Sequence, residues 1–208
     1  GTVVLERIVA ELNGVPAQAV EVIEPQRKGM AVTRSFGIPI TTLEVLMGAI
    51  AQYAMRAGEK LRQHGLVAGR LTVFFHTNRH RPDRPQYSAS RAMALHPMSD
   101  DGFVLIAAAR RGAETAWRDG FAFTKAGIIL EHLERADLRQ RTLFEHADGI
   151  ERRERLMSAL DAINQRYGKF TVVPGVQGFR RSWTTRADMR SPAWTTRIED
   201  VPLAIAKG

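Results

Sequence analysis

The chain has 208 residues, of which 44% are apolar, enough for one sizeable core or two small ones. Its net charge of +8 and pI near 10.5 favour an acidic partner such as a nucleic-acid backbone, although ordinary solubility charge explains the same count. Cysteine is absent, which excludes disulfides and thiolate metal sites. The sequence contains no run of 18 apolar residues, so we expect no membrane span.

The first segment predicts a helix, because its apolar residues recur at helical spacing and Asn13-Gly14 is a stop signal. The residues of this apolar face are Leu5, Ile8, Val9 and Leu12. Residues 15–29 mix Pro, Glu, Arg and Lys and predict a linker. The chain begins at Gly1 without an initiating Met, which suggests an excised fragment or a tag scar at Gly1.

The following hundred or so residues alternate between strand and helix patterns. We expect strands over 31–36, 70–77, 86–95 and 121–130, a helix from Thr41 or Thr42 to about His64, and a helix capped by Ser99 or Asp100. The second helix has Phe103, Ile106, Ala107, Ala113, Ala116 and Trp117 as expected core residues. This order predicts an α+β fold, a split β-α-β-β-α-β unit whose four-stranded antiparallel sheet carries two helices on one face.

The sheet face opposite the helices is the candidate binding surface, because helices cover only one side. Its polar candidates are Arg34, Arg70, Thr72, Ser88, Ser90, Thr124 and Lys125, of which only some can share a face. Hydroxyls and isolated cations suit phosphate contacts, which carry no sequence information. No stripe of exposed aromatic residues is evident for base stacking. Residues 30–133 hold 13 Lys or Arg and 8 Asp or Glu, so a merely solvated face explains the pattern too.

A short peptide follows this unit and has the pattern of a sliding-clamp-binding motif. In Gln140-Arg141-Thr142-Leu143-Phe144, Leu143 and Phe144 would enter an apolar pocket while the Gln140 amide binds at its edge. Short motifs recur by chance, and the alternative is that Leu143 and Phe144 pin the chain to its own domain.

The remaining segment predicts a helix followed by irregular or β structure. Leu156, Leu160 and Ile163 share one helical face, and Gly168 follows the helix end. We expect a short strand over 170–173, and burial of Trp183, Met189 and Trp194 against that helix.

Several motifs resemble the little-finger domain of Y-family translesion DNA polymerases, and in particular the UmuC-like catalytic subunit of DNA polymerase V with its MucB, ImpB and SamB relatives. They are Val4-Leu5-Glu6-Arg7, Glu11-Leu12-Asn13-Gly14, Thr33-Arg34-Ser35-Phe36-Gly37, Tyr53 to Leu61, Thr124-Lys125-Ala126-Gly127, Leu160 to Asn164, Arg166-Tyr167-Gly168 and Ser191-Pro192-Ala193-Trp194-Thr195-Thr196-Arg197. The last stretch usually has Tyr where this chain has Trp194. The resemblance covers nearly the whole chain.

The resemblance implies four parts. These are the end of the thumb and a linker (1–29), the little-finger domain (30–133), a connector with the clamp motif (134–151) and a small UmuC-type C-terminal domain of mixed helical and irregular structure (152–208). In the family, the little finger grips template-primer DNA. Ser35 and Gly37 would lie in a turn whose main chain approaches phosphate, and Lys125 would contact phosphate from the last strand.

The family also implies partners and an activity. The partners are the bacterial sliding clamp, bound through Gln140, Leu143 and Phe144, a UmuD′-like dimer and the RecA filament. The setting is cytoplasmic SOS repair and mutagenesis on damaged DNA. The parent polymerase holds Mg²⁺ with palm carboxylates. No equivalent set is evident in these 208 residues, so we expect no catalytic residue, metal site or cofactor in this chain, and no activity of the chain alone.

Two other functions compete with this one. A non-catalytic clamp-associated accessory protein is disfavoured because the first residues resemble the interior of a longer chain. An RNA-binding split β-α-β module is disfavoured because a central strand lacks the aromatic signature of such modules. The reading frame upstream of Gly1 would distinguish the three, since paired palm carboxylates there would select the polymerase.

Overall fold

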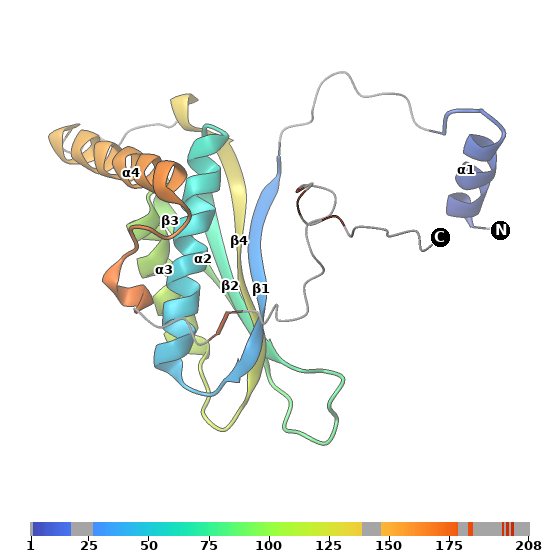
Figure 1. Ribbon diagram of the computed structural model, residues 1–208, viewed down its shortest axis with the longest axis horizontal. Helices are drawn as coiled ribbons and strands as arrows, with labels where there is room; N and C mark the ends of the chain where they lie inside the picture. The colour runs from blue at the N-terminus through green and yellow to red at the C-terminus, as the bar shows by residue number, and fades with distance from the viewer. Residues whose placement is uncertain are drawn as a thin grey trace, which may run out of the picture.

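The computed structural model describes residues 2–17, 27–138, 147–178, 183–184, 197, 199 and 201. Its helices are α1 (Val3–Leu12), α2 (Leu43–Gln63), α3 (Gly102–Ala116) and α4 (Ala147–Tyr167), and its strands are β1 (Gly29–Ile40), β2 (Leu66–Thr77), β3 (Ser88–Ser99) and β4 (Phe123–Arg135) (Figure 1). Short 3₁₀ turns follow at η1 (Ala136–Leu138) and η2 (Gly175–Gln177). The predicted order of strands and helices is confirmed, and the strands are longer than their sequence patterns indicated.

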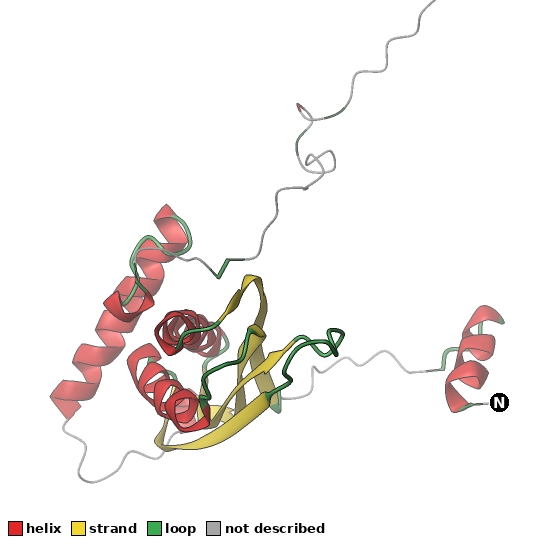
Figure 2. Ribbon diagram, turned by 90° about the horizontal axis from the view of Figure 1, so that it is seen from below, coloured by secondary structure: helices red, strands yellow, loops and turns green. Residues whose placement is uncertain are grey.

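The four strands form one antiparallel sheet in the order β1-β4-β2-β3. Strands β1 and β2 are parallel to each other with β4 between them, and β3 and β4 are parallel with β2 between them. The fold is therefore two interleaved split β-α-β units, which confirms the predicted α+β class. Helices α2 and α3 both cover the same face of the sheet (Figure 2).

The core lies between this helix layer and the sheet. Leu46, Ile50 and Leu61 of α2 meet Leu71 and Phe75 of β2 in one cluster, each fully buried. Removing this much apolar surface from water is the main force holding the layers together.

Helix α3 differs from its prediction in which residues it buries. Its buried residues include Leu105, Ala108 and Ala109, whereas Phe103 and Ala107 face solvent. Its N-cap is Asp101, whose Oδ1 accepts hydrogen bonds from the backbone N–H groups of Phe103 at 2.8 Å and Val104 at 3.3 Å.

Helix α4 forms a third layer on the outer side of the helix layer (Figure 2). Met157 is its one fully buried side chain in the described part of the helix. The Arg62 guanidinium of α2 donates two hydrogen bonds to the Asp161 carboxylate, at 2.7 and 2.9 Å, and a further one to the Asp100 carbonyl. Arg153 pairs with Asp101 at 2.7 Å. The C-terminal segment is therefore fastened to α2 and to the start of α3.

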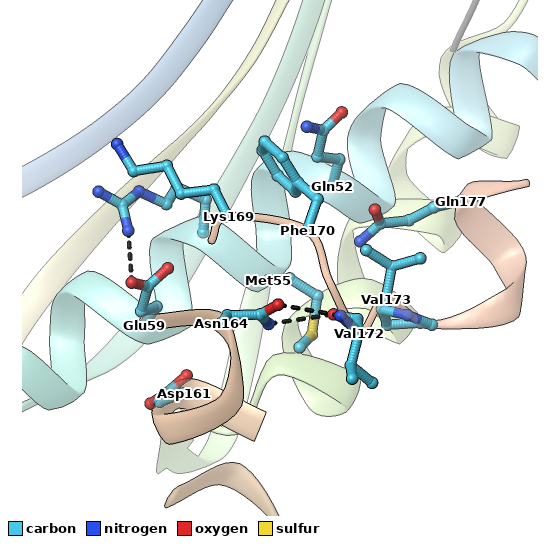
Figure 3. A pocket seen from close by; sticks show the side chains of 12 residues that line it. Gln52, Met55, Glu59, Asp161, Asn164, Lys169, Phe170, Val172, Val173 and Gln177 are labelled. Carbon is cyan, nitrogen blue, oxygen red and sulfur yellow. Dashed lines mark hydrogen bonds and ion pairs between the residues drawn. The ribbon is translucent and has the colours of Figure 1, made fainter. Parts of the chain in front are cut away.

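The segment after α4 turns back onto α2. Gly168, with φ of +107°, follows the helix as predicted, but residues 170–173 form a turn and a bend rather than the predicted strand. The Asn164 side chain explains this path, since it donates to the Val172 carbonyl and accepts from the Val172 N–H, both at 3.0 Å (Figure 3). Among the described strands, none pairs with residues 170–173.

Trp183 is buried as predicted, but against α2 rather than α4. Its indole N–H donates to the Gln52 side chain at 3.3 Å. A Cβ on Gly48 would lie 2.9 Å from the indole ring, so only glycine at this position lets the ring approach the helix. Met189 and Trp194 lie outside the described residues.

The predicted N-terminal helix is present as α1, and its large apolar side chains are all exposed. Of the described helices, none combines the length and apolar character needed to cross a membrane.

Candidate nucleic-acid interface

The sheet face opposite α2 and α3 is built from four rows of side chains that run across the strands. Strand pairing defines each row, and alternation along each strand puts these residues on the face away from the buried ones. In the order β1, β4, β2, β3, the rows are Ser35-Lys125-His76-Ser88, Thr33-Gly127-Phe74-Ser90, Ala31-Ile129-Thr72-Ala92 and Gly29-Glu131-Arg70-Ala94. No described helix covers this face (Figure 2).

The first row concentrates groups that can donate hydrogen bonds to phosphate. It contains two hydroxyls, one ammonium and one imidazole, and no carboxylate. Three interstrand spacings of about 4.8 Å make the row about 14 Å wide. This array is suited to phosphate contacts, which position a protein on a duplex without selecting a sequence.

The rows bring together five of the seven predicted polar candidates. Arg70, Thr72, Ser88, Ser90 and Lys125 all lie on the open face. They are spread over the four rows rather than gathered at one point, so the face offers an extended surface and not a compact pocket.

Arg34 is one of the candidates that do not lie on the open face, and its contact with DNA stays a prediction. Arg34 pairs with Ala126, which is fully buried under the helices. The Cβ of Arg34 therefore lies on the helix-covered side of the sheet. There, burial raises the pKa of the Tyr53 phenol of α2, and the positive charge of Arg34 partly opposes that rise. Arg34 stays exposed because β1 is an edge strand.

Thr124 and Gly37 lie where the strand pairing is irregular. The β2–β4 register shifts between His76 and Thr77, which leaves Thr124 at a bulge, and the β1–β4 register shifts after Ser35. Ser35-Phe36-Gly37 is thus an irregular stretch inside β1 and not the turn that the family resemblance implied. Bulges re-aim side chains at the end of a sheet.

A cavity of about 210 Å³ lies at this end of the sheet, beside the first row. Its lining residues come from the end of β1, the β2–β3 loop and the start of β4, and include Pro39, Arg81, Arg84 and Thr124. The Arg81 guanidinium is held by Asp83 through two 2.9 Å hydrogen bonds, which lower the pKa of the Asp83 carboxyl to about 2. The loop therefore presents Arg84 as its more available cation at the cavity.

Phe74 and His76 are residues of the open face that sequence reasoning missed. Their rings are stacked, with centroids 6.5 Å apart and planes 13° from parallel. A Cβ on Gly127 would lie 2.8 Å from the Phe74 ring and 2.6 Å from the Thr33 methyl group, so the ring lies directly over this glycine. The available signal was the spacing of two from Thr72, which puts Phe74 and His76 on the same face of the strand.

The fourth row is electrically mixed. Arg70 is directly opposite Glu131, whose carboxylate also accepts a 3.1 Å hydrogen bond from the Thr72 hydroxyl. The carboxylate offsets the Arg70 charge, so the positive end of the face is the row that contains Lys125 and His76.

The predicted clamp residues Gln140, Leu143 and Phe144 lie outside the described residues. In the part of the chain that the structure describes, no three His, Asp or Glu side chains gather closely enough to hold a metal ion.

Comparison with known proteins places the chain in a family. The model of the impB/mucB/samB family C-terminal domain matches residues 27–143, more than half of the chain. The chain belongs to the impB/mucB/samB family. A second model, a domain of unknown function, matches residues 154–204, which include most of α4 and the segment that folds back onto α2.

Individual members of the family match along nearly the whole chain. Protein SamB of Salmonella typhimurium is 36% identical over 97% of the chain, Protein ImpB of the same species is 34% identical over 98%, and its Protein UmuC is 34% identical over 96%. These matches cover 47%, 48% and 47% of the relatives, respectively. The chain therefore spans about half the length of the curated relatives it matches.

Proposed function

We propose that this chain is the DNA-gripping and partner-docking C-terminal part of an error-prone translesion DNA polymerase that acts in SOS-type repair and mutagenesis. The observation that carries the proposal is the uncovered sheet face, whose first row has four possible phosphate donors and no carboxylate. Membership of the impB/mucB/samB family supports the same function. The Mg²⁺-dependent chemistry would belong to carboxylates outside these 208 residues.

The face would bind duplex DNA through its backbone. Lys125 is the permanent cation of the first row, and Ser35 and Ser88 flank the row at the two edge strands. Each neutralised phosphate adds about 0.9 to the slope of log affinity against log salt concentration. Binding should therefore depend on salt and be similar for all sequences.

The test measures duplex binding by the whole chain over several salt concentrations. Lys125→Ala should lower the salt slope by about 0.9 for every sequence tested. Arg111→Ala is the matched control, because Arg111 is an exposed arginine of α3 and so lies on the helix side. Salt-independent binding, or equal effects of the two variants, would reject the open face as the DNA surface.

Arg34 separates two versions of this proposal. Sequence reasoning expected Arg34→Ala to weaken DNA binding as Lys125→Ala does. If the open face alone contacts DNA, Arg34→Ala should have little effect on DNA affinity, since the Cβ of Arg34 lies on the helix-covered side of the sheet. A loss equal to that of Lys125→Ala would mean that DNA also reaches the β1 edge.

The partner-docking part of the proposal rests on the motif Gln140 to Phe144. Burying a Leu and a Phe contributes roughly 1.5–3 kcal/mol each before ordering costs, so we expect affinity for the sliding clamp on the order of micromolar. Replacing both Leu143 and Phe144 by Ala should abolish clamp binding in calorimetry and leave DNA affinity unchanged. Unchanged clamp affinity with a lowered melting temperature would mean that the pair packs inward instead.

The UmuD′-like dimer and the RecA filament complete the proposed partners, with residues 152–208 as the segment that would dock them. Pull-down of each partner by the whole chain, compared with a chain ending at residue 151, tests this assignment. Equal capture by both chains would contradict it.

A further inference from the structure

We propose that His76 is a proton-dependent phosphate contact, so that the open face holds DNA more tightly as the pH falls below neutral. The proposal rests on the proposed DNA-binding function and adds a residue and a form of regulation to it. It is carried by the position of His76 in the first row, by the hydrogen bond that orients its ring, and by the cation opposite.

The imidazole is oriented by its own strand. His76 Nδ1 lies 2.8 Å from the Thr77 carbonyl oxygen. A carbonyl can only accept, so Nδ1 carries a proton, and Nε2 of the neutral ring is an acceptor. Within the described part of the chain, Nε2 has no hydrogen-bond partner. The neutral ring thus presents a lone pair to a phosphate, whereas the protonated ring presents a second N–H donor.

The surroundings of the ring suit a shared anion. Lys125 of β4 is the charged residue directly opposite, and Ser88 of β3 on the other side is neutral. The Phe74 ring stacks on the imidazole from within β2. No described helix packs on this face, so none of these helices brings a carboxylate to the ring.

Lys125 and His76 are directly opposed across β4 and β2. Directly opposed residues have Cβ atoms about 5 Å apart, so one phosphate can approach both. Its negative charge favours protonation of the imidazole, and DNA binding should be coupled to uptake of a proton.

The expected effect is one additional neutralised phosphate at low pH. Histidine changes its charge between about pH 5 and pH 8, so the comparison is made at about pH 6 and about pH 8. The salt slope should be steeper by about 0.9 at the lower pH. Between about 50 and about 200 mM salt, this corresponds to a roughly threefold larger loss of affinity.

The experiment measures fluorescence anisotropy of a short labelled duplex with the whole chain at both pH values and over that salt range. His76→Gln should give the shallower slope at both pH values, and His76→Arg the steeper slope at both. His64→Gln is the matched control, an exposed histidine at the C-cap of α2, and should behave like the unmodified chain. Melting curves of each variant check the fold, and His76→Arg carries the test if His76→Gln unfolds.

The possible results distinguish a failure of the His76 inference from a failure of the proposed DNA binding. Absence of duplex binding by the unmodified chain at both pH values would reject DNA binding itself. Duplex binding whose pH dependence persists in His76→Gln or His76→Arg would reject the role of His76 and leave DNA binding standing.

Discussion

The ion pair between Arg62 and Asp161 provides the sharpest test of how the C-terminal helix is held. The two side chains are only 14% and 18% exposed, and two hydrogen bonds join them, at 2.7 and 2.9 Å. Bidentate pairs of this kind are stronger than neutral hydrogen bonds, and a hydrogen bond to a charged group contributes about 1.5–3 kcal/mol. Asp161→Asn keeps the shape and removes the charge.

We expect Asp161→Asn to lower the free energy of unfolding by about 2 kcal/mol. Arg62 keeps its contact with the Asp100 carbonyl, which limits the loss. For a chain of this length, about 2 kcal/mol corresponds to a fall of about 4–8 °C in melting temperature. Urea unfolding monitored by circular dichroism gives the free energy, and calorimetry gives the melting temperature.

The matched control is Arg153→Gln, which breaks a second described ion pair between α4 and the helix layer. Arg153 is 55% exposed, and exposed pairs contribute about 0–1 kcal/mol. Equal destabilisation by Asp161→Asn and Arg153→Gln would refute the argument that burial makes the Arg62 pair the stronger one.

Three further predictions concern other parts of the fold. Burial raises the pKa of the Tyr53 phenol. The contribution of Tyr53 to stability should therefore be constant below about pH 10, where an unfolded tyrosine ionises, and should be lost above it. Tyr53→Phe should abolish this part of the alkaline loss in urea titrations. Gly127→Val should cost about 1–3 kcal/mol by clashing with the Phe74 ring, and a wild-type melting temperature would contradict that clash. Limited trypsin digestion should cut first between Arg135 and Arg155, and first cleavage inside α2 would contradict this.

The split β-α-β-β-α-β fold could be predicted because its segments alternate cleanly between two periods. The β2 residues Leu71, Val73 and Phe75 are buried at a spacing of two, and Thr72 and Phe74 between them are only partly buried. Helix α3 shows the limit of such patterns. Its own apolar residues occupy nearly every side of the helix. The periodicity of the sequence alone therefore did not reveal that Phe103 and Ala107 face solvent.

The candidate site was predictable as a face but not as a set of residues. Polarity placed Lys125 and Ser88 correctly, yet it misplaced Arg34, because an edge strand lets a charged residue escape to solvent from the covered side. His76 became visible only with the strand register, which places it beside Lys125. The packing of Trp183 on Gly48 joins residues more than a hundred positions apart, which no local pattern encodes.

The strand order has a consequence for the way the chain reaches this state. Strand β1 pairs with β4, so Gly29 finds its partner Glu131 only after about a hundred intervening residues have been made. Strands β2 and β3 are joined by a short loop and can pair at once. Closing a long loop costs entropy before its contacts form, which slows folding. During synthesis, β1 therefore has no β4 partner until the last strand of the sheet emerges, and an unpaired strand edge is prone to aggregation during this interval.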